Sequence, residues 1–252
     1  MTQLENHFED NVNSEKQWKG IYTLGGIATL VVLAGSLLDA VVGSIRGGNL
    51  SAIPQTAIGR FAQFQDNWLL GLFNLDLLNV INQIVMIPAF FALYEAHRKV
   101  KGAYAALALV VFLVGTTIFV TTNTALPMLE LSRQFAASTA EFQKTMLAAA
   151  GEAMLARGAH GSPGVFIGFM LPNMAGFIMS LVMLSGKIFG KVTSYFGIAG
   201  SALIAIYIIL VTFVPGVKNM AMAFAMPAGL LLMGWMILFA VRLFRLGRPE
   251  HG

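Results

Sequence analysis

The stretch that decides the fold runs from Trp68 to Tyr94 and reads WLLGLFNLDLLNVINQIVMIPAFFALY. It is long enough to cross a membrane, because a transmembrane helix needs about 20 mostly apolar residues. It also carries strongly polar side chains, which are costly in lipid and by default mark a functional site. These residues are Asn74, Asp76, Asn79, Asn82 and Gln83.

The composition places the whole chain in the membrane class. Only 11% of its 252 residues are charged and 57% are hydrophobic, whereas soluble domains carry about 25% charged residues. Such a chain cannot cover a water-facing surface. Cysteine is absent, which excludes disulfides, thiolate metal sites and cysteine nucleophiles. The net charge of +4 comes from basic residues near helix ends, so it indicates orientation in a membrane and not nucleic-acid binding.

Apolar segments of spanning length set the predicted architecture. We predict an all-α fold, a polytopic transmembrane helical bundle with six spans. A polar segment, residues 1–20, precedes a membrane domain over 21–247 and a tail over 248–252. The first apolar run is expected to be a retained helix and not a cleaved signal peptide. The spans expected are Ile21–Ile45, Trp68–Tyr94, Ala103–Thr122, Gly164–Gly186, Thr193–Val214 and Met220–Leu243.

Basic residues in the short connections orient the bundle. Arg98, Lys99 and Lys101 lie in one connection, and Lys187 and Lys191 lie in another. Short loops rich in Lys and Arg stay in the cytoplasm. Both connections fall on the same side of a six-span bundle. We therefore expect both termini to be cytoplasmic and the chain to cross the cell inner membrane several times.

One of the two long outer connections is itself predicted to be helical. Pro127–Ser162 is too polar to cross the membrane, and it repeats apolar residues at helical spacing. We predict an extra amphipathic segment over 127–162, made of one or two helices that lie on or cap the outer end of the bundle. Two interpretations stay open: a surface helix that shields loops, or a lid over an outward-facing cavity. The apolar stripe consists of Leu131, Phe135, Thr139, Phe142, Met146, Ala149 and Ala153.

Helical spacing sorts the polar residues of the second span. Asp76, Asn79 and Gln83 follow i, i+3, i+7 spacing and share a face, Asn82 flanks that face, and Asn74 lies on another side. Such a face meets the bundle, water or a ligand, and not lipid. Hydrogen bonding between helices is one interpretation of the Asn and Gln residues, and a ligand site is the other.

Asp76 is harder to explain by helix packing alone. No Lys, Arg or His lies well inside another span, so we expect no intramembrane cation to pair with it. A neutral carboxyl or access to water from outside is the expected alternative, which motivates a proton- or cation-linked site. Two lesser candidates join the site. Asn173 follows Pro172, whose ring permits a kink in the fourth span, and Asp39 lies near the outer end of the first span.

Signatures of catalysis and of metal or cofactor binding are missing from the sequence. The four histidines, His7, His97, His160 and His251, lie outside the spans and are too scattered to suggest a metal cluster. No hydrolase elbow, zinc motif or phosphate-binding loop occurs. We therefore predict no catalytic residue, no metal and no cofactor, and a non-enzymatic role is favoured.

Six short stretches form a recognisable pattern when they are taken in order. They are Phe64–Gly71 (FQDNWLLG), Asn79–Pro88 (NVINQIVMIP), Ala92–Arg98 (ALYEAHR), Asn123–Met128 (NTALPM), Leu147–Ala153 (LAAAGEA) and Phe196–Gly200 (FGIAG). From about Ile21 to Gly247 the chain resembles a bacterial family of six-span membrane proteins catalogued only as a domain of unknown function. The resemblance implies six spans and a bacterial inner membrane. It transfers no substrate, cofactor or catalytic residue.

Three functions remain open from the sequence. The leading hypothesis is a non-enzymatic binder or carrier of a small amphipathic or cationic ligand, a candidate transporter. The second is a structural or accessory subunit of a membrane complex, and the third is a membrane-embedded lipid-modifying enzyme. The expected partners are the lipid bilayer, a small-molecule ligand, and a partner subunit or second copy, but not nucleic acid. The ligand-binding residues predicted are Asp76, Asn79, Asn82, Gln83, Asn173 and Asp39.

Overall fold

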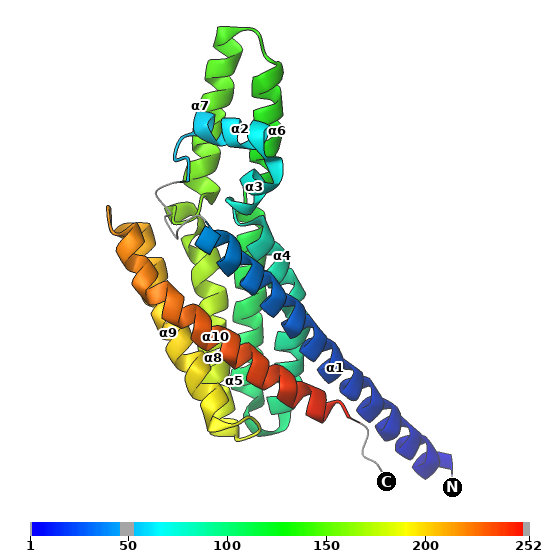
Figure 1. The fold of residues 1–252 in the computed structure, drawn as a ribbon. Coiled ribbons are helices and arrows are strands. Elements are labelled where there is room, and N and C mark those ends of the chain that lie inside the picture. Colours follow the sequence, from blue (N-terminus) through cyan, green and yellow to red (C-terminus); the bar gives the residue numbers. More distant parts are fainter. Residues whose placement is uncertain (1, 46–52, 249–252) are drawn as a thin grey trace.

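A computed structural model describes the backbone of residues 2–45 and 53–248, and over these ranges the chain is helical, with no strand. The longest helices form one bundle (Figure 1). A smaller group of helices stands at one end of this bundle. The bundle helices are α1 (Thr2–Ile45), α4 (Leu77–Val85), α5 (Ile87–Thr122), α8 (Phe166–Gly186), α9 (Lys191–Phe213) and α10 (Lys218–Leu246).

Five stretches within the described residues are helical, long and apolar enough to cross a membrane. Large apolar side chains on their outer faces are exposed, including Leu30, Val110, Ile206 and Leu230. A water-facing surface does not carry such an apolar belt. These helices therefore indicate a membrane-embedded, multi-pass protein. The five stretches are Gln17–Gly43, Leu77–Ala137, Pro163–Gly186, Lys191–Phe213 and Asn219–Leu246.

The chain reverses direction inside α5. Lys101 leaves the helical region with φ −139° and ψ 39°. The rings of Phe90 and Phe112 stack with centroids 3.8 Å apart, whereas a straight helix would separate the two residues by about 33 Å at about 1.5 Å per residue. The expected cytoplasmic connection around Lys101 thus lies at a true reversal. The total of six spans remains a prediction.

The second predicted span is not one continuous helix, so this expectation is wrong. Trp68–Phe73 forms α3, and the chain then breaks before α4 begins at Leu77. Asp76 takes a left-handed conformation with φ 62° and ψ 21°. Asn and Asp interrupt helices because their short polar side chains bond locally and tolerate left-handed backbone. A second break at Met86 separates α4 from α5, whose first turn contains Pro88.

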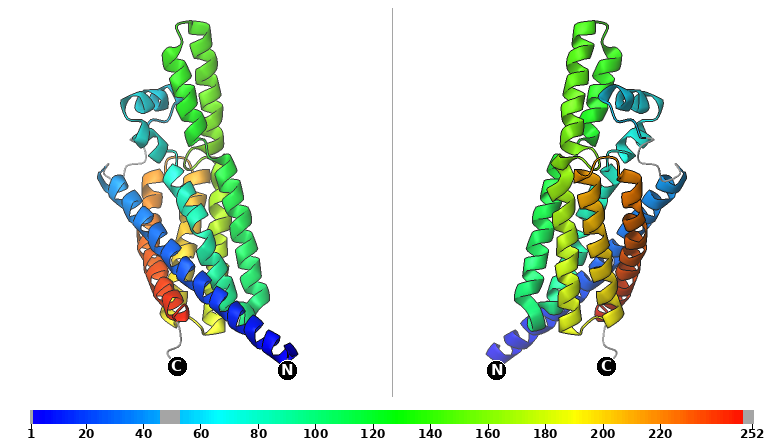
Figure 2. Two further views of the ribbon diagram at one scale, coloured as in Figure 1. Left: turned by 90° about the vertical axis from the view of Figure 1, so that its right-hand side faces the viewer. Right: turned by 90° about the vertical axis from the view of Figure 1, so that its left-hand side faces the viewer.

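The outer segment folds as two helices, α6 (Ala125–Ala137) and α7 (Glu141–Gly158). They form a hairpin that projects away from the bundle, with α2 (Ala57–Asp66) lying across it (Figures 1 and 2). The expected apolar stripe does not make one buried face, because Phe142 is 78% exposed and Met146 58% exposed. The turn between the two helices divides the stripe, so only its α6 part packs against α2. The residues buried there include Phe61, Phe64, Met128 and Leu155.

The α6–α7 hairpin lies at one end of the molecule (Figures 1 and 2). The start of α1 and the end of α10 are close to the same end of the bundle (Figure 2). The inner part of the bundle is packed with aromatic and Met side chains of α5, α8 and α10, such as Phe112, Met179 and Phe239. Gly115 lets α5 and α8 approach closely, because a Cβ there would lie 2.5 Å from Pro172 Cδ.

Candidate functional site

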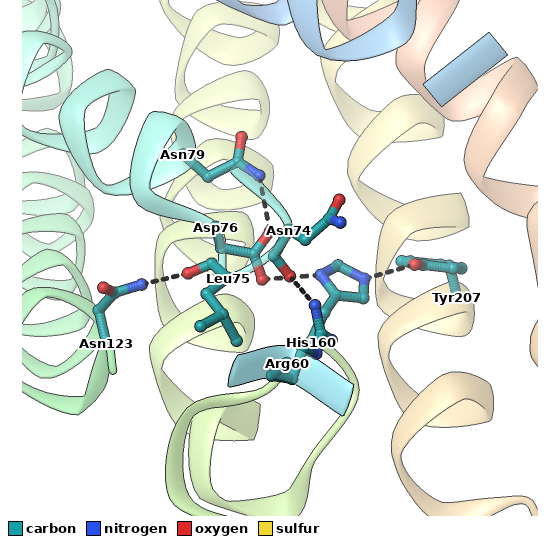
Figure 3. A network of polar contacts seen from close by, with 8 residues as sticks. All are labelled: Arg60, Asn74, Leu75, Asp76, Asn79, Asn123, His160 and Tyr207. Atoms are coloured by element: carbon teal, nitrogen blue, oxygen red, sulfur yellow. Dashed lines mark hydrogen bonds and ion pairs between the residues drawn. The ribbon is translucent and has the colours of Figure 1, made fainter. Parts of the chain in front are cut away.

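The break at residues 74–76 sits where α3, α4 and the outer helices meet, and side chains from elsewhere in the chain satisfy its backbone. Helix ends leave carbonyl groups without partners inside the helix, and buried carbonyls need donors. The side-chain amide of Asn123 donates to Leu75 O at 2.7 Å, and Arg60 Nη1 lies 3.4 Å from Asn74 O (Figure 3). Polar residues from α2 and from the end of α5 therefore hold the break in place.

Three side chains in contact with one another, Asp76, His160 and Tyr207, link this break to α9. His160, in the loop after α7, places Nδ1 3.0 Å from Asp76 Oδ2 and Nε2 2.6 Å from the hydroxyl oxygen of Tyr207 (Figure 3). The amide of Asn79 donates to the other carboxylate oxygen, Asp76 Oδ1, at 3.0 Å. Both oxygens of Asp76 are thus engaged, and the residue is only 8% exposed.

The surroundings of His160 favour its protonated form. Burial lowers the pKa of the imidazole, but the Tyr207 oxygen and the Asp76 carboxylate raise it, and the result lies well above the usual 6.5. A carboxylate beside an imidazole stabilises the imidazolium by charge and by hydrogen bonding. These contacts favour the imidazolium, in which Nδ1 donates to Asp76 and Nε2 donates to Tyr207.

A cavity of about 350 Å³ lies inside the bundle beside the side chains of Asp76, His160 and Tyr207, and the last two are part of its wall. The structure brings four of the six predicted ligand residues together around it. Asn79, Asn82 and Gln83 reach it from the α4 region, and Asn173 reaches it from α8. The Asn173 amide also donates to Ser201 O on α9 at 3.0 Å, which fixes its orientation.

The remaining wall of this bundle cavity is mostly apolar. Phe90, Phe112, Leu232 and Met236 contribute to it. Two polar atoms of lining residues are buried and have no hydrogen-bond partner among the described residues, the acceptor Gln83 Oε1 and the donor Trp235 Nε1. Both atoms have almost no accessible surface, so they are packed within the wall and do not point into the cavity.

A second cavity of about 240 Å³ lies on the outer side of His160. Arg60 from α2 and Ser162 from the loop before α8 contribute polar groups to its wall. His160, Gly161 and Val211 line both cavities. His160, Gly161 and Val211 therefore separate the second, more polar cavity from the largely apolar bundle cavity.

Two predicted site residues differ from expectation. Asp76 pairs with His160, a partner that the sequence did not suggest and that lies in a loop and not in a span. Asp76 directly precedes α4 in a left-handed conformation and does not share a helical face with Asn79 and Gln83, although its side chain contacts Asn79. Asp39 lies on α1 and is not among the residues that line either cavity.

Sequence reasoning missed His160, Tyr207 and Arg60. Tyr207 lies within a span, where a phenol is not unusual, and Arg60 lies in a connection that was read as irregular. One local signal existed for α2: Thr56 caps it by accepting from Gly59 N at 3.2 Å, and Phe61 and Phe64 follow at helical spacing.

The arrangement can hold a proton on His160 and present a hydroxyl to the bundle cavity. The carboxylates Asp39, Glu130 and Glu152 do not line it. Comparisons with protein families, curated proteins and solved structures found no match for this chain.

Proposed function

We propose that this protein is a non-enzymatic membrane protein that binds a small amphipathic molecule inside its helical bundle. The observation that carries the proposal is the bundle cavity itself. Its volume of about 350 Å³ falls within the usual range for ligand pockets, roughly 300–1,000 Å³. Apolar walls with a few convergent polar groups are typical of such pockets. Asn79, Asn82, Gln83 and Asn173 supply polar side chains in its wall.

The proposed topology has six spans in a bacterial inner membrane. The reversal at Lys101 supports two crossings within Leu77–Ala137, one on each side of it. The basic connections around Arg98 and Lys187 support a cytoplasmic location for that end and for both termini. The α6–α7 hairpin then faces outward with α2, and it covers the side from which the second cavity is reached.

The test places a larger side chain on the wall of the bundle cavity, so that it occupies the space a ligand would need. Gly229 lines the cavity, and a Cβ at this position meets nothing within 4 Å. Gly229→Leu should therefore occupy the space without displacing a neighbour. Gly43→Leu is the matched control, because its Cβ also meets nothing within 4 Å and the residue is not part of the cavity wall.

Thermal unfolding in lipid nanodiscs would be recorded with dodecanoate, dodecanol and dodecyltrimethylammonium as probes. A ligand that binds only the folded state stabilises it by RT ln(1 + L/Kd), where L is the free ligand concentration, so the stabilisation grows with ligand concentration. At least one probe should raise the Tm of the wild type and of Gly43→Leu, and should leave Gly229→Leu unchanged. Equal shifts in all three proteins, or no shift in any, would remove the cavity as a binding site.

One observation favours the lipid-modifying enzyme as a second candidate. The Asp76–His160–Tyr207 chain ends on the cavity wall and can pass a proton to a bound molecule. Incubation with a bacterial polar lipid extract, followed by mass spectrometry, tests it. A new product made by the wild type but not by Tyr207→Phe would support the enzyme; identical lipid profiles would exclude it.

The accessory-subunit hypothesis receives less support. Its premise was that the polar residues of α4 contact a neighbouring helix or chain, yet Asn79, Asn82 and Gln83 line an internal cavity. A stoichiometric partner recovered on purification in mild detergent would restore it.

A further inference from the structure

The charge of the bundle cavity wall limits the ligands that it can hold. Among the described residues that line it there is no Asp, Glu, Lys or Arg. His160 is the one of them that can carry a positive charge, and the Asp76 carboxylate 3.0 Å from its ring balances that charge. An ion in a buried apolar space without an opposite charge loses its hydration and is strongly disfavoured. The wall therefore favours an uncharged molecule.

Ser201 on α9 supplies a free hydroxyl to this wall. The residue is only 2% exposed and lines the bundle cavity. Its hydroxyl makes no hydrogen bond to another described residue, yet, unlike Gln83 Oε1 and Trp235 Nε1, it keeps accessible surface. Gly176 lies on the same wall, and a Cβ there would be 3.5 Å from Ser201 Oγ. The glycine therefore leaves the space beside the hydroxyl open.

Asn82, from α4, adds an amide in the same state. The residue is 9% exposed and lines the cavity, and its side chain makes no hydrogen bond to another described residue. Neither polar atom of the amide is fully enclosed. Gly35 of α1 packs directly against the amide, because a Cβ at Gly35 would overlap Asn82 Oδ1. A positioned amide with two donors and an acceptor is thus unused by the described protein groups.

The Tyr207 hydroxyl also keeps hydrogen-bonding capacity. Its one partner among the described residues is His160 Nε2, at 2.6 Å (Figure 3). A hydroxyl has one donor and two acceptor positions, so a single contact leaves part of this capacity unused. Tyr207 lines the cavity. The wall therefore offers uncharged groups that can both donate to a ligand and accept from it.

Polar and apolar groups of the wall come at different points along the chain. From the break at Asp76 the chain runs to the reversal at Lys101, so Asn82 precedes Phe90 and lies nearer to the break. Phe90 stacks on Phe112, and both rings line the cavity. A molecule with a small polar head near Asn82 and an apolar chain beside the two rings meets groups of matching polarity at both ends.

We propose that the bundle cavity binds an uncharged single-chain amphiphile whose head carries a hydroxyl or an amide, held by Ser201, Asn82 and Tyr207. Its chain lies beside Phe90 and Phe112. This inference rests on the proposed function and adds the charge and the polar contacts of the ligand. A hydroxyl or amide head donates and accepts at once, as the unused groups of the wall require.

The first experiment compares probes that share a dodecyl chain and differ in the head. Dodecanol, dodecanamide, dodecane, dodecanesulfonate and dodecyltrimethylammonium would be titrated into the wild type in neutral-lipid nanodiscs, and partition into empty nanodiscs would give each probe's concentration in the bilayer. Dodecanol and dodecanamide should bind at least about tenfold more tightly than dodecane, since two hydrogen bonds contribute about that much. They should exceed both ions by the same factor or more, because an unpaired buried charge costs more than a hydrogen bond. Equal affinity for dodecanol and for either ion, or for dodecanol and dodecane, would overturn the proposal.

Ser201→Ala removes the free hydroxyl and leaves the cavity otherwise intact. Affinity for dodecanol should fall about threefold or more, the value of one hydrogen bond, and affinity for dodecane should not change. The Tm without ligand should not fall, because the hydroxyl has no partner to lose among the described residues. Ser185→Ala is the matched control, since its hydroxyl is exposed and bonds to its own helix α8. An unchanged ratio of dodecanol to dodecane affinity in Ser201→Ala would overturn the proposal.

Asn82→Leu should act in the same direction on dodecanol and dodecanamide. Ser201→Ala decides the matter if Asn82→Leu does not fold. The outcomes separate the two proposals. If Gly229→Leu abolishes binding of every probe but the wild type does not prefer uncharged polar heads, the bundle cavity stands as a site and the uncharged head falls. If no probe depends on Gly229, the proposed function itself fails.

Discussion

The contact between Asp76 and His160 is the part of the site whose contribution is most directly measurable. Asp76→Asn keeps the size of the side chain and suits the left-handed backbone at this position, because asparagine tolerates that conformation. The asparagine has one acceptor oxygen where the carboxylate has two, so it cannot accept from both Asn79 and His160. The substitution therefore removes a charge-assisted hydrogen bond of 3.0 Å and little else.

The expected loss of stability in Asp76→Asn follows from the burial and the charge of the two side chains. A hydrogen bond to a charged group contributes about 1.5–3 kcal/mol. Asp76 is nearly buried, but the side chain of His160 is 26% exposed, so water weakens the charge part of the interaction. We expect a loss of about 2 kcal/mol in the free energy of unfolding, which is about thirtyfold in the folding equilibrium.

A double-mutant cycle measures the coupling energy between Asp76 and His160. Unfolding by dodecyl sulfate in mixed micelles would be followed for the wild type, Asp76→Asn, His160→Gln and the double variant. The two single losses should exceed the loss in the double variant by about 1–2 kcal/mol, because the contact can be removed only once. Asp66→Asn, an exposed carboxylate at the end of α2, should change stability by less than about 0.5 kcal/mol. A coupling energy near zero between Asp76 and His160 in folded proteins would refute the reasoning.

Three further predictions follow from the geometry. Stability should fall as pH rises above about 6.5, because the pKa of His160, lowered by burial but raised more by Tyr207 and Asp76, is higher in the folded state than in the unfolded state; thermal unfolding across pH would show this slope in the wild type and a flatter one in His160→Gln. Gly115→Ala should cost about 1–3 kcal/mol in unfolding free energy, because its Cβ would lie 2.5 Å from Pro172 Cδ. Asn123→Ala should cost about 1–3 kcal/mol in the same measurement, because it leaves the carbonyl of the fully buried Leu75 without its donor.

The pH dependence and the Gly115→Ala prediction each have an outcome that contradicts them. The pH prediction fails if the wild type and His160→Gln lose stability in parallel, because other groups would then be responsible; Asp76, Tyr207 and Arg60 are the titratable or charged neighbours of the ring. Gly20→Ala is the control for the helix interface, since a Cβ at Gly20 meets nothing. A gain in stability at Gly115 as large as at Gly20 would show that α5 and α8 can separate at no cost.

Composition and the length of apolar runs were sufficient to predict a helical membrane protein, because the bilayer limits which segments can span it. They were not sufficient to predict the break in the second span. Asn74 and Asp76 were read as residues of one continuous helix, with only Asp76 in the site, yet both lie at a break in that helix. Whether a polar residue interrupts a helix depends on partners for the freed carbonyls, and here Arg60 and Asn123 supply them from other elements.

The candidate site was also predicted only in part from the sequence. Asn79, Asn82 and Gln83 were identified because they are close in sequence, and helical spacing places them on or beside one face of a helix. Asn173 was found because it follows a proline within a span. His160 was dismissed, because its distance of 84 residues from Asp76 carries no local signal. The interpretation of 127–162 as a surface helix or a lid also gave no reason to look at the loop that follows α7.

The position of His160 changes the role assigned to Asp76. A carboxylate exposed to an outer vestibule would attract cations, and that reading led to a cation-linked site. With Asn79 on one oxygen and His160 on the other, Asp76 instead ties the loop after α7 to the break before α4. It also stabilises a positive charge on a ring that lines both cavities. The carboxylate that looked like a ligand site from the sequence is thus a structural partner of Asn79 and His160.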